Sequence, residues 1–210
     1  MGLAITVGIL GDLLENDPEA AEIMQEEFFY VNEVLAAHKL PLHKEPEKKL
    51  ALDSMALIEN YPGVFIHHLR RVAAHAWNKP KYVAEYFRQV EEPKDDEFLK
   101  KEIARNSSHL IMHSDCEGFY VPIEFKEVIA DDRVLGGILC STQVLMRELI
   151  SIAPCLGIKL EDGKLSDKEA DRINGHAESE DPLSIEYCVW ISLYESARLS
   201  LKHKAAIHFG

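Results

Sequence analysis

The chain has 210 residues, of which 47% are hydrophobic, and its 36 acidic and 23 basic residues give a formal net charge of -13. This composition excludes a disordered chain, and so acidic a surface repels nucleic acid and anionic lipid. No run approaches the roughly 20 apolar residues of a membrane helix, and the apolar start lacks the basic region of a signal peptide. We therefore expect one globular domain over residues 1–210 in the cytoplasm, with no nucleic-acid or membrane partner.

The first half of the chain is dominated by helical patterns. Residues 3–15 combine strand-like alternation with helical spacing, and the good helix formers of their second half favour a helix. Asp17 and Pro18 are expected to begin a helix that runs to about residue 37. Four acidic residues of this helix should remain in solvent: Glu22, Glu26, Glu27 and Glu33. Periodicity predicts further helices over residues 64–77, 82–90 and 96–105, and a weaker one over 50–58.

The second half mixes strands and helices. Two short apolar runs, residues 110–112 and 119–123, flank a polar loop that contains Gly118, and this pattern predicts a β-hairpin. Helices should follow Gly136 and Gly137, the capping box that begins at Ser166, and Asp181. Residues 205–209 are expected to form a final strand. The predicted fold is α+β and mainly α, with a helical body and a small antiparallel hairpin or sheet.

The four cysteines favour a reduced protein. Cys116, Cys140, Cys155 and Cys188 form no CxxC pair, and a disulfide scaffold would be shorter and richer in cysteine. No phosphate loop, dinucleotide fingerprint or zinc-finger spacing occurs either. We therefore expect free thiols and no cofactor.

A histidine-rich segment at residues 65–75 offers an alternative enzymatic interpretation. Arg70 and His75 have an Arg-x4-His spacing, which resembles the short motif of the HEPN ribonucleases. That resemblance implies that Arg70 and His75 would act on an RNA phosphodiester bond. The spacing of the histidines does not match a zinc protease helix, so a helix with a polar face is the plainer interpretation.

The loop at residues 113–117 is the second candidate site. His113, Asp115, Cys116 and Glu117 bring an imidazole, a thiol and two carboxylates together. Two adjacent carboxylates would raise the thiol pKa, which disfavours cysteine catalysis. The alternatives are a polar turn and a metal site that uses His113 and Asp115 for a hydrolase. We expect no metal, because the ligand spacing is absent.

The chain as a whole resembles small acidic bacterial immunity proteins that neutralise polymorphic toxins. The resemblance lies in its size, its acidity and the stretch from His113 to Pro122, and it transfers no specific residues. It implies a protein-binding module whose partner is a cognate toxin or another basic protein. Acidic residues would speed the encounter, and exposed aromatic residues would anchor the contact. The expected binding residues are Asp115, Glu117, Phe119 and Tyr120. The oligomeric state stays open.

Overall fold

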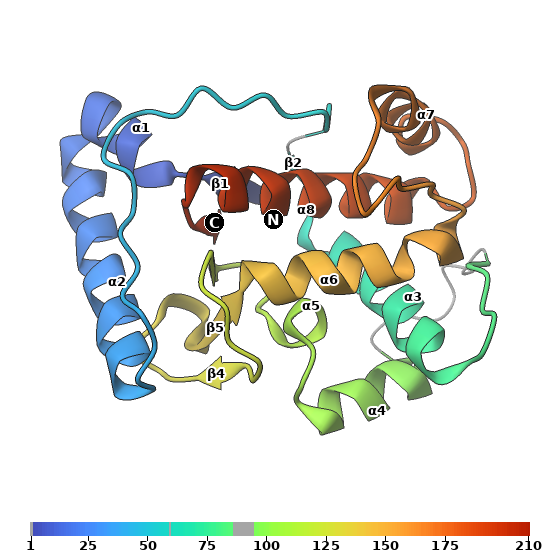
Figure 1. The fold of residues 1–210 in the computed structure, drawn as a ribbon, viewed down its shortest axis with the longest axis horizontal. Helices are drawn as coiled ribbons and strands as arrows, with labels where there is room; N and C mark the ends of the chain where they lie inside the picture. Colours follow the sequence, from blue (N-terminus) through green and yellow to red (C-terminus); the bar gives the residue numbers. More distant parts are fainter. Residues whose placement is uncertain (1, 59, 86–94) are drawn as a thin grey trace.

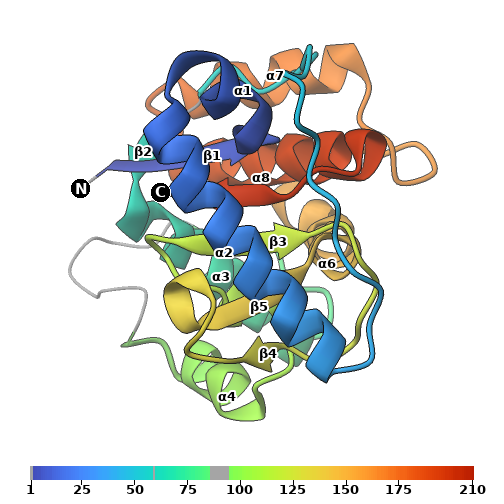
Figure 2. The same ribbon diagram turned by 90° about the vertical axis from the view of Figure 1, so that its left-hand side faces the viewer.

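A computed structural model of the protein describes residues 2–58, 60–85 and 95–210. The described residues form a mixed six-stranded sheet with helices packed on both faces (Figures 1 and 2). The fold is α+β and mainly α, which confirms the predicted class. No helix in this part of the chain is long and apolar enough to cross a lipid bilayer.

The strands follow the order β2-β1-β6-β3-β5-β4 across the sheet. Their bounds are β1 (Gly2–Val7), β2 (Asn60–Pro62), β3 (Gly118–Val121), β4 (Ile129–Ala130), β5 (Ile138–Ser141) and β6 (Ile207–Phe209). The β3–β5 pair is parallel and the other pairs are antiparallel. The sheet is therefore mixed rather than antiparallel throughout. The expected final strand is present as β6, which lies between β1 and β3.

The α-helices of the described residues surround this sheet. They are α1 (Ile9–Asn16), α2 (Pro18–Ala37), α3 (Ile66–Asn78), α4 (Glu97–Arg105), α5 (His109–Met112), α6 (Thr142–Ile152), α7 (Asp167–Ala177) and α8 (Ser184–His203). Short 3-10 turns cover Gly63–Phe65, Leu135–Gly137 and Ala153–Leu156. Asp17 caps α2 through the amide of Ala20, and Ser166 caps α7, as expected.

The predicted β-hairpin is wrong. Its first half is the helix α5, which the Ser108 side chain caps at its N-terminus. The Glu148 carboxylate accepts the amides of His109 and Leu110 at 3.1 and 2.7 Å. These two side chains satisfy the free amides of a helical turn, so the apolar run folds as a helix. β3 pairs instead with β5 and β6.

Four other segments also differ from expectation. Residues 3–15 divide into β1 and α1 at Gly8, whose φ of 72° no ordinary side chain favours. Residues 40–58, named the strap here, form no helix and run in extended form from the end of α2 to β2 (Figure 1). Residues 82–85 are not helical, and the rest of that predicted helix lies outside the described residues. The helix predicted after Gly137 begins only at Thr142, because β5 comes first.

The sheet is buried on both faces at β3, all four of whose residues are buried. Phe119 and Val121 of β3 point into an apolar cluster that the buried side of α2 covers. Tyr120, between them, belongs to the larger cluster formed with α3, α6 and α8. Figure 2 shows α2 crossing in front of β3, β4 and β5. This arrangement leaves only the outer side of α2 to face solvent.

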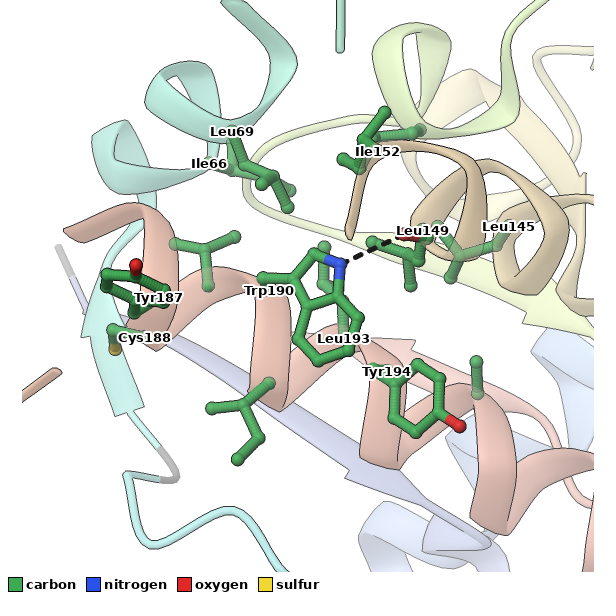
Figure 3. Packing of buried hydrophobic residues seen from close by; sticks show 14 of the residues in the cluster. Ile66, Leu69, Leu145, Leu149, Ile152, Tyr187, Cys188, Trp190, Leu193 and Tyr194 are labelled. Atoms are coloured by element: carbon green, nitrogen blue, oxygen red, sulfur yellow. Dashed lines mark hydrogen bonds between the residues drawn. The ribbon is translucent and has the colours of Figure 1, made fainter. Parts of the chain in front are cut away.

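Trp190 lies at the centre of the larger cluster and is fully buried (Figure 3). Its indole Nε1 donates to the Leu149 carbonyl at 3.0 Å, and its ring stacks on Tyr194. We expect Trp190→Ala to lower the free energy of unfolding by about 3–5 kcal/mol, because the change leaves a large cavity. Urea denaturation measures this. Trp77→Ala, at a partly exposed tryptophan, should cost clearly less, and an equal cost would contradict this assignment of the core.

Candidate functional site

The first 37 residues carry a one-sided charge. They contain eight acidic residues and no lysine, arginine or histidine: Asp12, Glu15, Asp17, Glu19, Glu22, Glu26, Glu27 and Glu33. This segment forms β1, α1 and α2, and the two helices lie together at one end of the molecule (Figure 1). A concentration of acidic groups without cations destabilises a fold through self-repulsion, so it invites a functional explanation.

Four of these side chains form a line along α2. Glu19, Glu22, Glu26 and Glu33 follow one another at three-, four- and seven-residue intervals, and all are exposed. At about 100° per residue they fall within roughly 60° of the helix circumference. We name these four residues the acidic stripe. At 1.5 Å per residue it extends about 21 Å.

The acidic stripe lies opposite the side of α2 that packs on the sheet. The buried residues of the helix are Ala21, Met24, Phe28, Val31, Val34 and Leu35. Packing of this apolar side against β3 and β5 fixes the direction in which the stripe points. The exposure of Glu22, Glu26 and Glu33 agrees with the prediction from helical phase, whereas Glu27 is half-buried at the edge of the helix.

Two large apolar side chains lie among the carboxylates. Ile23 is 64% exposed and Phe29 is 58% exposed. Tyr30 lies beside them and donates its hydroxyl to Glu26 at 3.1 Å. The outer surface of α2 therefore combines negative charge with apolar anchors, as protein-binding surfaces do.

Acidic groups also crowd the flank of α2. Partial burial raises the pKa of Glu27, and the charges of Glu26 and Glu117 raise it further, against a hydrogen bond from the Leu135 backbone. Glu117 is exposed in the loop before β3. It therefore extends the negative surface from α2 onto the neighbouring loop.

The four expected binding residues have two different locations. Asp115 and Glu117 lie at the surface. Phe119 and Tyr120 are 0% exposed, because α2 covers one and α8 with its neighbours covers the other. The two aromatic residues therefore cannot contact a partner in this structure, and the expectation that they anchor one is corrected.

His113 and Asp115 do not form a metal site with a third ligand in the described part of the chain. His113 is buried and stacks on Tyr120 with ring centroids 4.1 Å apart. Burial lowers its pKa to about 3. Asp115 Oδ2 lies 2.8 Å from His67 Nε2. Partial burial raises the pKa of Asp115, but the contact with His67 outweighs burial and the pKa is lowered. The two expected ligands are thus engaged in different contacts.

The Arg70 and His75 side chains are also held by separate elements. Arg70 is buried, and its guanidinium donates to the carbonyls of Leu110 and His113. His75 Nε2 lies 2.6 Å from Asp96 Oδ2 at the start of α4. Both residues join α3 to other elements, which gives each a structural role whether or not either has another.

The cysteines differ in their access to solvent. Cys116 is exposed and Cys155 is half-buried. Burial raises the pKa of Cys188 to about 11 and that of Cys140 well above its ordinary value. We expect a thiol reagent at pH 7.5 to label Cys116 quickly, Cys155 slowly and the other two only after unfolding, when the count should reach four. Cys116→Ser should remove the fast phase. Rapid labelling of Cys140 or Cys188 in the native protein would contradict the structure.

Comparison with known proteins gives one match. A family model described as "Putative DNA-mimic protein" matches residues 1–209. The chain belongs to this family. Searches of curated proteins and of solved structures found no match to compare with it. Membership in the DNA-mimic family agrees with the prediction of a protein-binding module.

The same match corrects the expected partners. The description of the DNA-mimic family names DNA as the molecule that is imitated, so the expectation that nucleic acid has no place in the interactions of this protein is wrong. The match gives no support to a cognate toxin as the partner. A net charge of -13 predicts repulsion of DNA, although the same charge makes a surface resemble DNA.

Sequence reasoning missed the apolar part of the surface. The apolar character of Ile23 predicts a core position on the helix over residues 18–37, but the structure exposes it beside the acidic stripe. The absence of any lysine, arginine or histidine before residue 38 is visible in the sequence and marks this segment. This one-sided charge of the first 37 residues predicts the position of the acidic surface, which the net charge of the whole chain does not.

Proposed function

We propose that the protein binds a DNA-binding protein at the surface where that protein holds DNA, and so competes with DNA. The observation that carries the proposal is the acidic stripe on the outer side of α2, in a segment without cations. Membership in the DNA-mimic family supports it independently.

The spacing of the carboxylates suits this role. Successive members of the acidic stripe rise about 4.5 to 10.5 Å along the helix axis. Phosphates rise about 3.4 Å along one DNA strand, so the carboxylates are about one to three phosphate steps apart. Lysine and arginine side chains that contact phosphates can contact carboxylates with the same charge-assisted hydrogen bonds.

The stripe also offers more than charge. Phe29 and Ile23 present apolar area that a DNA backbone lacks, and burial of such area lengthens the life of a complex. The partner surface that fits best has phosphate-binding cations around an apolar hollow. The narrower expectation of an immunity protein stays a prediction that the comparisons do not test.

Competition with DNA tests the proposal. The immobilised protein is exposed to a nuclease-treated lysate, so that DNA cannot bridge captured proteins to it. We expect captured proteins to be released by added duplex DNA and to bind that duplex afterwards. A parallel column of Glu22→Lys/Glu26→Lys should capture far less of them. Captured proteins that duplex DNA neither releases nor binds would refute the proposal.

A further inference from the structure

A cavity of about 450 Å³ lies between β1, the strap and α8. Its size falls within the range of small-molecule sites in proteins. Apolar side chains from all three elements line it, including Ile5 of β1, Leu50 and Ile58 of the strap, and Leu199 of α8. It lies apart from the outer side of α2, so it does not belong to the acidic stripe.

Two serines on consecutive turns of α8 add polar groups to this wall. Ser192 and Ser196 line the cavity and are 5% and 8% exposed. No hydrogen bond joins the Ser196 hydroxyl to another residue in the described part of the chain. The hydroxyl oxygen is not among the fully buried polar atoms that lack a partner, so it is open to the cavity. An oxygen atom of a molecule bound in the cavity would accept a hydrogen bond from this hydroxyl.

The charge of the cavity indicates the kind of molecule. Asp12 and Lys49 are the charged residues of the described lining, and their side chains pair at 2.5 Å. They neutralise each other, so the cavity has no net charge with which to attract an ion. An uncharged ligand enters without separating this pair.

The strap covers the cavity without main-chain pairing to β1 in its described residues. It is attached through side chains: Glu195 accepts the Met55 amide at 2.8 Å, and Asn174 accepts the Leu57 amide at 3.2 Å. Asp53 pairs with Lys202 at the surface, where an ion pair contributes little. Such a cover can lift locally without disturbing the sheet, which gives a ligand a route inward.

We propose that this cavity binds an uncharged, mostly apolar small molecule whose carbonyl or hydroxyl oxygen bonds Ser196. The apolar walls supply most of the affinity, and the hydroxyl fixes the orientation of the polar end.

Three ten-carbon probes test the proposal: decanamide, decanoate and decyltrimethylammonium. Amide chemical shifts in NMR spectra of the full chain report where each binds. We expect decanamide to perturb β1, the strap and α8, and to bind more tightly than either ion. No binding of any probe there, or tighter binding of either ion, would overturn the assignment.

Two variants and one control distinguish binding in this cavity from nonspecific binding of an apolar probe. Ala56→Phe fills the cavity from the strap and should weaken decanamide binding at least tenfold. Ser196→Ala removes only the hydroxyl oxygen and should weaken it about fivefold, the value of about one hydrogen bond. Ile150→Phe, in a different hollow between α6 and α8, should leave binding unchanged. Equal effects of all three variants, each confirmed as folded by circular dichroism, would overturn the proposal.

Discussion

Replacing Glu22 and Glu26 by lysine is expected to weaken binding of the captured DNA-binding protein at least a hundredfold. Both side chains are exposed at the centre of the acidic stripe, and each change turns an attraction into a repulsion. A hundredfold loss corresponds to about 2.7 kcal/mol, which is modest for two reversed contacts in a charged interface. Biolayer interferometry at two salt concentrations measures it, and the variant should also lose part of the salt dependence.

The matched control places the same change at the opposite end of the molecule. Asp167→Lys/Asp171→Lys alters two exposed residues of α7, which lies far from α2 (Figure 1). Each double variant changes the net charge from -13 by +4 to -9. The α7 variant should bind almost as well as the native protein. Equal losses of affinity in both double variants would mean that binding depends on the net charge of the protein and not on the acidic stripe.

Lowering the pH from 7 to 4.5 is expected to lower the free energy of unfolding by roughly 3 kcal/mol. Burial lowers the pKa of His109 and His208 to about 4 and that of His113 to about 3. Below pH 6.5 these histidines therefore bind protons in the unfolded chain but not in the folded chain. Lowering the pH from 7 to 4.5 thus lowers the free energy of unfolding by roughly 2 kcal/mol per histidine. Burial raises the pKa of Glu148 to about 7, which works in the opposite direction and offsets part of the loss.

Urea denaturation at pH 7, 5.5 and 4.5 measures this dependence. His208→Gln keeps a neutral polar side chain on β6 and should remove about a third of the histidine contribution. His38→Gln, at an exposed histidine, is the control and should leave the dependence unchanged. A native protein that is as stable at pH 4.5 as at pH 7 would show that His109, His113 and His208 do not govern its response to acid.

The helices could be predicted better than the strands. α2 has a cap at Asp17, a proline in its first turn and apolar residues at helical spacing, and all three signals agree. The run from Leu110 to Met112 has a local cap at Ser108 but no proline and no long helical periodicity. Its helical state depends on Glu148, which is distant in sequence, and a short apolar run alone does not distinguish helix from strand.

Only part of the candidate surface can be predicted from the sequence. Helical phase places Glu22, Glu26 and Glu33 on one side of a helix, and the structure agrees. The burial of Phe119 and Tyr120 could not be predicted from local pattern. It results from packing of α2 and α8 on opposite faces of β3, contacts between segments far apart along the chain.

The position of β6 has a consequence for biosynthesis. This strand joins β1 to β3, so residues 207–209 connect the two halves of the sheet. A ribosome makes β1 some 200 residues earlier, and during that time β1 has no partner on this side. Final assembly must therefore wait until residue 209 has left the exit tunnel, and pairing between such distant segments is intrinsically slow. Until then the nascent chain exposes unpaired strand edges, which makes it prone to aggregation.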